Sequence, residues 1–177
     1  YTLRARGTHV AGTRARIVEA IMRLHEEVGP RHTTVSAIAD RAGVQRLTVY
    51  RHFEDDASMF AACSQRYLEL NPLPDPASWA AETDPLRRTK LALEKFYAFF
   101  TRTSAMFTNI YRDVEESPAL REVMGQFDAF LRKQADALAS AWPRDASSAS
   151  RCTILRHAIK FATWQSLELD HVNNKLK

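Results

Sequence analysis

The stretch Thr33–Phe53, TTVSAIADRAGVQRLTVYRHF, has the pattern of two short helices joined at a glycine. The first helix places apolar residues at the i, i+3, i+4, i+7 spacing of one buried face, at Val35, Ile38, Ala39 and Ala42. Thr34 suits its N-cap, and Gly43 suits the left-handed position where the chain leaves it. A second helix is expected from about Gln45, so the stretch predicts a helix-turn-helix, whose second helix can enter a DNA major groove.

The same stretch resembles the DNA-binding domain of the tetracycline-repressor (TetR) family of transcription regulators. The residues that match in register are Ile38-Ala39, Ala42-Gly43-Val44, Thr48-Val49-Tyr50 and His52-Phe53. The resemblance implies a sequence-specific transcriptional regulator, most simply a repressor released by a small apolar or aromatic inducer. It also implies a homodimer on a palindromic operator of double-stranded DNA. The alternative for the motif alone is a helical hairpin that packs and binds nothing.

The resemblance places base contacts at the start of the second helix. Gln45 is expected to cap that helix, with Arg46, Leu47 and Thr48 nearest the base edges. Arginine matches the paired acceptors of guanine, and leucine can contact a thymine methyl group. The family often has serine at the position of Gln45 and a small residue at that of Leu47. Both departures are consistent with a distinct operator, although Leu47 can equally be read as an apolar surface residue.

Phosphate contacts are expected from Thr34, Ser36, Tyr50 and His52, which would orient the protein without reading sequence. For Tyr50 and His52 the alternative is packing with ordinary solvation. The family usually carries a lysine that holds the DNA backbone at the position of Asp56. An acid there puts one phosphate contact in doubt.

The positive charge is concentrated near the helix-turn-helix. Residues 1–53 contain nine arginines and four acidic residues, a net charge of +5, whereas the remaining residues carry a net charge of −1. This distribution is typical of a protein that contacts phosphates. The sequence has no membrane-spanning run or signal peptide, so we expect a cytoplasmic protein with no membrane partner. Cys63 and Cys152 have no metal-like spacing and are expected to be reduced.

The expected fold is all-α. A three-helix DNA-binding domain with its connecting helix would occupy residues 1–69, a proline-rich linker residues 70–85, and a helical ligand-binding and dimerisation domain residues 86–177. Residues 1–12 are expected to be a solvated arm that can lie along DNA, and Thr13–Val28 the first helix. The connecting helix Asp56–Tyr67 is the expected route of coupling between the domains.

Four further helices are expected in the second domain, over residues 86–103, from 106 to about 111, from Ser117-Pro118 to before Pro143, and over 151–169. The last has two apolar faces. TetR-like proteins dimerise through their final two helices in a four-helix bundle, so one face would meet a partner subunit. The sequence stops at Lys177, just where another helix would be due, so we expect this domain to be C-terminally incomplete.

The second domain is rich in aromatic residues, and the resemblance implies an inducer pocket among them. The candidate pocket residues are Tyr97, Phe100, Phe107, Tyr111, Phe127, Phe130, His157, Phe161 and Trp164. Polar contacts are expected from His157, Gln165, Asn109 and Tyr97. A plain aromatic core is the alternative for most of these residues.

Other classes of protein fit less well. His25-Glu26-Glu27 lacks the second histidine of a zinc-protease helix, and the sequence has no phosphate loop or nucleophile elbow. We therefore expect no enzyme, with no catalytic residues, metal or cofactor. A helical DNA-binding architectural protein without a ligand is the main alternative, and a small all-α enzyme the lesser one.

Overall fold

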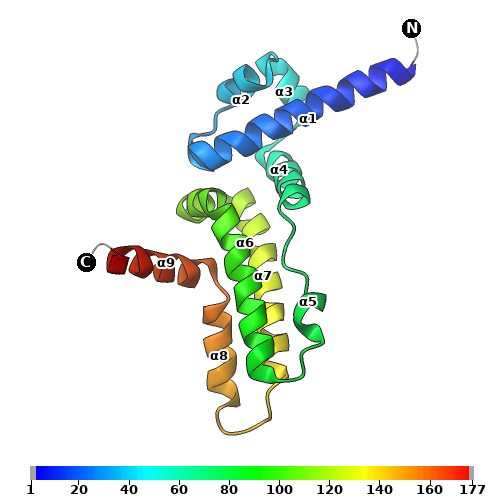
Figure 1. Ribbon diagram of the computed structural model, residues 1–177. Coiled ribbons are helices and arrows are strands. Elements are labelled where there is room, and N and C mark those ends of the chain that lie inside the picture. The colour runs from blue at the N-terminus through cyan, green and yellow to red at the C-terminus, as the bar shows by residue number, and fades with distance from the viewer. Residues whose placement is uncertain (1–2, 176–177) are drawn as a thin grey trace. The chain divides into compact units, whose positions relative to one another are not determined.

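The computed structural model describes the backbone of residues 3–175 and the side chains of residues 10–170. Every regular element in this part of the chain is helical, so the all-α prediction is confirmed. The α-helices are α1 (Leu3–Glu27), α2 (Val35–Ala42), α3 (Arg46–His52), α4 (Asp56–Leu70), α5 (Ala77–Ala80), α6 (Pro85–Asp113), α7 (Pro118–Ser140), α8 (Ser148–Ala158) and α9 (Phe161–Lys175), labelled in Figure 1. Two short 3-10 helices, η1 (Pro30–His32) and η2 (Val114–Glu116), follow α1 and α6.

The contacts between residues divide the chain into two compact units. The first comprises residues 1–72 and 105–124, and the second comprises residues 73–104 and 125–177. Helices α6 and α7 therefore each contribute residues to both units. This grouping by contact places residues 105–124 with the N-terminal helices, whereas the predicted domains follow sequence order. The predicted domain division stays a prediction.

In the first unit, α1 packs against α2 and α4, and α2 packs against α3. Figure 1 shows the short helices α2 and α3 folded beside the long helix α1. Their apolar faces make a continuous core because Ile17 and Ile21 of α1, Ile38 of α2 and Val49 of α3 are almost inaccessible to solvent. Apolar burial of this kind is the main force that holds short helices together.

The prediction for the start of the first helix was wrong. We expected a solvated arm over residues 1–12 and a helix from Thr13, but α1 begins at Leu3. Residues 3–12 contain alanine, arginine and leucine, which favour helix, and no proline to stop it. Thr13, the expected first residue of the helix, is instead buried within α1. The side chains of Arg4 and Arg6, expected to follow DNA, lie outside the described side chains.

The predicted linker contains the short helix α5 and is anchored to the second unit. Trp79 of α5 is buried, and its ring lies 5.8 Å from that of Phe96 on α6. The sequence placed a break after Thr103, but α6 runs without interruption to Asp113. Residues 86–113 contain neither glycine nor proline, and the Thr103 hydroxyl donates to the Phe99 carbonyl inside the helix at 2.8 Å.

The last predicted helix is in fact two helices, α8 and α9, separated by a turn at Ile159 and Lys160. Two side-chain hydroxyl groups donate hydrogen bonds to carbonyl groups at the end of α8. The Tyr97 hydroxyl donates to the Ala158 carbonyl at 2.9 Å, and the Thr163 hydroxyl donates to the His157 carbonyl at 2.6 Å. These bonds satisfy carbonyl groups that have no helical donor at the end of α8. Apolar periodicity carries no information about such bonds, so it did not reveal the break.

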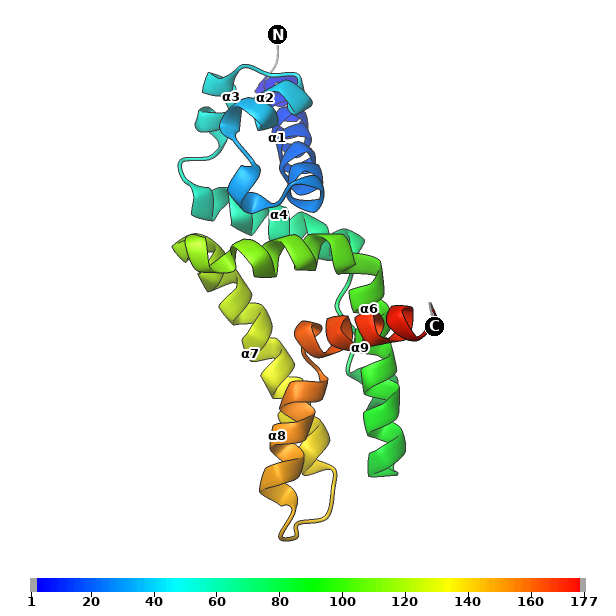
Figure 2. The same ribbon diagram turned by 90° about the vertical axis from the view of Figure 1, so that its left-hand side faces the viewer.

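Within the second unit, α8 lies against α7, as Figures 1 and 2 show. The guanidinium of Arg156 on α8 donates to the Asp136 carboxylate on α7 at 2.7 and 3.0 Å. The core of this unit is aromatic, with Phe96, Phe99, Phe100 and Phe161 almost inaccessible to solvent. In the part of the chain that the structure describes, no helix is both long and apolar enough to cross a membrane.

Candidate DNA-binding surface

The turn between α2 and α3 is built by two residues that the sequence predicted. Thr34 caps α2, and its hydroxyl oxygen accepts from the Ala37 amide at 3.1 Å. Gly43 ends α2 with φ +65° and ψ +43°, and its amide donates to carbonyls of the last helical turn. Any side chain in this left-handed conformation is strained, so glycine fixes the direction in which the chain enters α3.

Helix α3 is anchored by one face and exposed on the other. Val49 is only 1% exposed, whereas Leu47 and Tyr50 are 57% and 52% exposed. Gln45 occupies the N-cap position as predicted, but its side chain makes no capping hydrogen bond. The exposed start of α3 therefore presents Gln45, Arg46 and Leu47 together to solvent.

The carboxyl end of α3 is held against α1. Phe53, which follows the helix, is buried, and the guanidinium of Arg14 lies over its ring at 4.9 Å from the centroid. A cation over an aromatic face is attractive in this range. The pairing joins residues 39 positions apart, and the sequence analysis missed it because no local pattern marks it.

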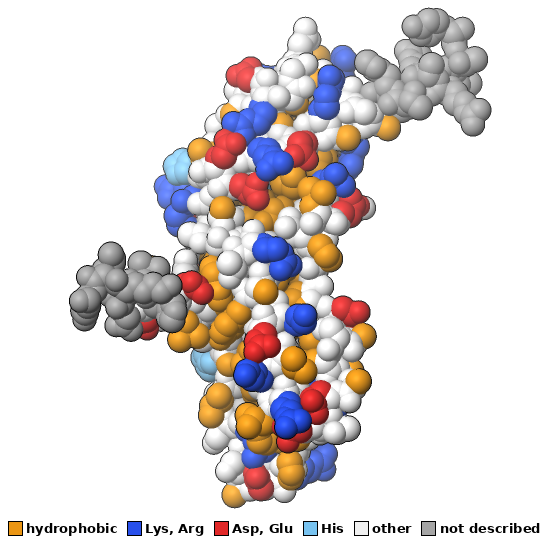
Figure 3. All heavy atoms as spheres, in the orientation of Figure 1, with side chains coloured by type: hydrophobic (Ala, Val, Ile, Leu, Met, Phe, Trp, Pro, Cys, Tyr) orange, Lys and Arg blue, Asp and Glu red, His pale blue; other side chains and the backbone are white. Residues whose placement is uncertain are grey.

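Much of the basic charge around these helices is already paired. Arg41 of α2 donates to Glu27 of α1 at 2.7 Å, and Arg23 lies 3.1 Å from Glu19. In Figure 3, basic and acidic side chains are interspersed on the visible face of the first unit. Arg46, by contrast, is exposed and has no hydrogen-bond or ion-pair partner among the described residues. An unpaired guanidinium at the start of a recognition helix can bind a base edge or a phosphate without first losing an ion pair.

The predicted phosphate-contacting residues differ in exposure. Thr34 and Tyr50 are exposed, while Ser36 and His52 are partly buried, as is Thr48 of the predicted base-contact set. The Thr34 hydroxyl accepts the capping bond, which leaves its proton available for donation to a phosphate oxygen.

Asp56 lies in the first turn of α4, where an acid favours the positive end of the helix dipole. The preceding Asp55 forms a capping box with Ser58: the Asp55 carboxylate accepts from the Ser58 amide at 2.8 Å, and the Ser58 hydroxyl lies 3.4 Å from the Asp55 amide. These bonds hold the pKa of Asp55 below its usual value. With Asp55 and Asp56, the start of α4 carries two acidic residues and lacks the lysine that TetR-family proteins usually have at the position of Asp56.

A model of bacterial regulatory proteins of the tetR family matches residues 17–63. The matched segment runs from α1 through the helix-turn-helix into α4, which are the elements described above. Residues 17–63 therefore form a DNA-binding domain of the TetR family. This domain makes the chain a DNA-binding transcriptional regulator, and the predicted resemblance to the family is confirmed.

Among the solved structures that are similar to this chain, two match it over most of its length. NalD, the secondary repressor of the MexAB-OprM multidrug efflux pump in Pseudomonas aeruginosa, is 25% identical, with a TM-score of 0.58 over 89% of this chain and 86% of NalD. A transcriptional regulator from Rhodococcus sp. Rha1 is 20% identical, with a TM-score of 0.62 over 92% of this chain and 85% of that regulator. A search of curated proteins found no match.

The nine candidate pocket residues do not all lie in one unit. Phe107 and Tyr111 belong to the first unit, where their rings are 6.2 Å apart, and the other seven belong to the second. Phe100, Phe161 and Trp164 pack together, with ring centroids 5.2–6.1 Å apart. Trp164 is 7% exposed, and its indole nitrogen has no hydrogen-bond partner among the described residues.

The structure gives the surroundings of three of the polar residues predicted for the pocket. The Tyr97 hydroxyl is bonded to the Ala158 carbonyl, and His157 is exposed beside an open hollow of about 280 Å³ between α7 and α8. Asn109 lies in the first unit, where its amide donates to two carbonyls of α1. The described residues contain no cluster of three or more His, Cys, Asp or Glu side chains suited to a metal.

Proposed function

We propose that this TetR-family regulator is a ligand-responsive repressor, released from its operator by a small apolar or aromatic inducer. The observation that supports sequence-specific binding best is the exposed start of α3. There an unpaired Arg46 lies beside an exposed Leu47, on a helix anchored by the buried Val49. This pairing suits a guanine next to a thymine methyl group in a major groove.

The contacts follow from this surface. Gln45, Arg46, Leu47 and Thr48 would read base edges, and the exposed Tyr50 with the residues around α2 would bind phosphates. A homodimer would present two copies of α3 to successive major grooves about 34–36 Å apart, which requires a palindromic operator. The protein would act in the cytoplasm, where its DNA lies, with no membrane partner.

The repressor role is supported by the similarity to NalD, which is itself described as a repressor. The inducer would bind among the aromatic side chains of the second unit. Because the buried indole of Trp164 has an unused N–H group, an inducer with one hydrogen-bond acceptor on an otherwise apolar or aromatic body would suit this site. Such a ligand releases DNA only if it binds the DNA-incompetent state more tightly.

Fluorescence anisotropy tests the DNA-binding proposal directly. The purified protein would be titrated onto labelled duplexes from upstream of its own gene and onto scrambled duplexes across a salt series. We expect specific affinity about a thousandfold above that for scrambled DNA, with a steep loss of affinity as salt rises. Equal affinity for both kinds of duplex at every salt concentration would contradict sequence-specific repression.

A further inference from the structure

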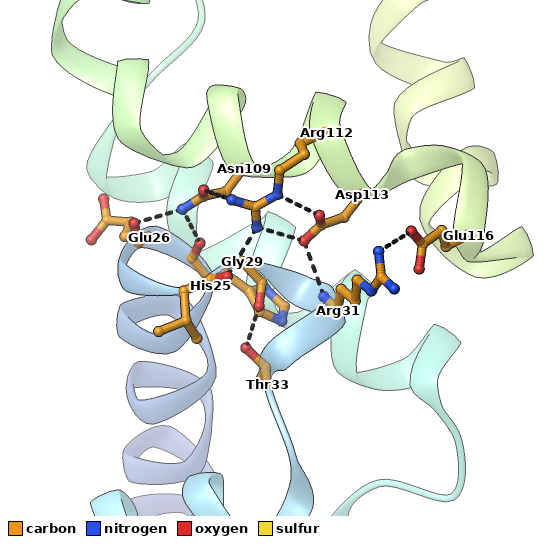
Figure 4. Close-up of polar contacts among 10 residues, drawn as sticks. His25, Glu26, Gly29, Arg31, Thr33, Asn109, Arg112, Asp113 and Glu116 are labelled. Atoms are coloured by element: carbon orange, nitrogen blue, oxygen red, sulfur yellow. Dashed lines mark hydrogen bonds and ion pairs between the residues drawn. The ribbon is translucent and has the colours of Figure 1, made fainter.

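The carboxyl end of α6 holds the carboxyl end of α1 through side-chain contacts to the main chain (Figure 4). The Asn109 amide donates to the carbonyl oxygens of His25 at 3.0 Å and Glu26 at 2.8 Å. These carbonyls belong to the last turn of α1, which has no helical donors for them. A side chain from α6 thus performs the capping that water or a local residue would otherwise provide.

Arg112 extends this contact past the end of α1. One guanidinium nitrogen, Nη2, donates to the Val28 carbonyl at 2.9 Å and to the Asp113 carboxylate at 3.0 Å. The other two nitrogens bond to the Asp113 carboxylate at 2.7 Å and to the Asn109 side-chain oxygen at 2.9 Å. The guanidinium is therefore fixed in one orientation, with its positive charge at the negative end of the α1 dipole.

Asp113 binds both Arg112 and the segment that follows α1. Its side chain is almost fully buried, and it accepts from the Arg31 amide at 3.1 Å. The hydrogen bond from Arg112 holds the pKa of Asp113 below its usual value, so the carboxylate stays charged at neutral pH. The Arg31 side chain in turn bonds to Glu116 at 2.5 Å. We refer to Asn109, Arg112 and Asp113 together as the α6 clamp.

Gly29 is the residue that allows the α6 clamp to close. Its φ is +89°, and a Cβ atom there would lie 2.2 Å from Nη2 of Arg112 and 2.5 Å from Oδ2 of Asp113. Both distances are far shorter than any normal contact, so no larger residue fits without displacing the clamp. The absence of a side chain at Gly29 therefore leaves room for Arg112 and Asp113, which lie more than 80 residues further along the chain.

The clamped segment leads directly into the helix-turn-helix. Residues 28–33 connect α1 to the Thr34 cap of α2, and the Thr33 hydroxyl donates to the Gly29 carbonyl at 2.8 Å. Fixing this connection fixes where α2 begins. Helix α6 itself continues without a break into residues 85–104, which pack in the second unit.

We infer that Asn109, Arg112 and Asp113 are positioning residues for DNA binding, which couple α6 to the helix-turn-helix by gripping the α1–α2 connection. The inference rests on the proposed function, since it concerns regulation of the same DNA-binding surface. This contact would be a second route of coupling, in addition to α4, which the sequence analysis predicted as the coupling helix. Because coupling between two regions is reciprocal, DNA bound at α3 also changes the stability of residues 85–104.

Hydrogen–deuterium exchange of the full chain, with and without a duplex selected by the protein from a random pool, tests this inference. In the wild-type protein we expect the duplex to slow exchange in peptides from residues 28–53 and from residues 85–104. Asn109→Ala removes the two bonds to α1 and the bond from Arg112 to the Asn109 side-chain oxygen, and it leaves the Arg112–Asp113 pair intact. We expect this variant to keep DNA protection at residues 45–53 and to lose at least half of it at residues 85–104.

Arg112→Ala should abolish the change at residues 85–104, and it also leaves the buried Asp113 without its ion pair. If that variant fails to fold, Asn109→Ala still decides the matter. Arg66→Ala is the matched control, because it removes an exposed ion pair with Glu69 on α4 and makes no contact with the clamp. It should behave as the wild type.

Three results would overturn the inference. One is protection of residues 85–104 in Asn109→Ala equal to that in the wild type, and another is no protection of these residues in the wild type while the duplex is bound. The third, seen without DNA, is unchanged exchange at residues 28–33 in Asn109→Ala. A pool that yields no preferred duplex would instead contradict the proposed function, and the inference with it.

Discussion

Arg14 of α1 stacks its guanidinium over the ring of Phe53, 4.9 Å from the ring centroid, at the end of the recognition helix. The ring is buried, while Arg14 remains exposed to solvent. The recognition helix is therefore held at its carboxyl end by a residue from the first helix as well as by its own apolar face.

Arg14→Ala should destabilise the protein by about 0.5–1 kcal/mol, the usual contribution of an exposed cation–π pair. It should also weaken operator binding, because the end of α3 loses one support. Urea unfolding and anisotropy on the preferred duplex measure the two effects. Arg16→Ala is the control, since Arg16 is exposed on the same helix and makes no ring contact among the described residues. Equal stability of the two variants would contradict a role for the Arg14–Phe53 pair.

Arg46→Ala should weaken binding to the preferred duplex by about 1–3 kcal/mol and relax the preference at one base pair. Competition anisotropy against duplexes with single base changes measures both quantities. Arg51→Ala, on the same helix, serves as a comparison for the loss of charge alone. An equal loss of affinity on every sequence would assign Arg46 to phosphate contact.

Gly43→Ala should destabilise the protein by about 1–2 kcal/mol, because alanine is strained at a left-handed φ of +65°. An added Cβ meets no atom within 4 Å, so backbone strain is the sole expected penalty. Gly12→Ala is the matched control: it also meets no atom but lies within α1, where alanine should stabilise by about 0.5–1 kcal/mol. Thermal unfolding should move the two melting temperatures in opposite directions, and a shift in the same direction would count against this account.

Burial gives His25 a pH dependence that can be measured. Its ring packs on Phe60, its Nδ1 lies 3.6 Å from the Cys63 sulfur, and burial lowers its pKa from 6.5 to about 4. Between these values the unfolded chain binds the proton more readily, so stability falls as the pH drops below about 6.5. The full loss is about 3 kcal/mol, reached near pH 4.

Urea unfolding between pH 7 and pH 5 measures this loss before most carboxylates titrate. His25→Phe keeps a ring in the site and should flatten the dependence, whereas His157→Asn, at an exposed histidine of the second unit, should leave it unchanged. A wild-type slope equal to that of His25→Phe would show that His25 does not control acid stability.

Tyr97→Phe should destabilise the second unit by about 1 kcal/mol, because it leaves the carbonyl of Ala158 without its donor at the end of α8. Differential scanning calorimetry of the variant against the wild type measures the change. Tyr50→Phe is the control, since that hydroxyl is exposed and has no hydrogen-bond partner among the described residues. If the two variants melt at the same temperature, the bond to Ala158 contributes nothing to stability.

Local signals predicted the helix-turn-helix well. Thr34 and Gly43 act at the positions where capping and turn chemistry favour their residue types, and Gln45 occupies the predicted N-cap position without a capping bond. The sequence therefore revealed both helices and the turn between them. The start of α7 after Ser117 was predicted for the same reason, and the Ser117 hydroxyl accepts from the Leu120 amide at 3.3 Å.

Contacts between distant residues could not be predicted in this way. At the break between α8 and α9 the Ala158 carbonyl accepts from the Tyr97 hydroxyl, which comes from another helix, whereas the periodic apolar pattern continues across the break. Asn109 is a predicted polar contact for the ligand, and in the structure its amide donates to carbonyls of α1 while its oxygen accepts from Arg112. The residues of the DNA-binding and pocket sets remain predictions, since the structure positions them without testing their roles.

The α6 clamp has a consequence for how its residues would vary among homologues. Asn109 and Arg112 bind carbonyl oxygens of His25, Glu26 and Val28, which every amino acid offers alike. Substitutions at those three positions leave the contact intact, so pairwise covariation between them and the clamp should be weak despite direct contact. The evolutionary trace of the clamp should instead be a glycine retained at position 29 wherever an arginine is retained at position 112.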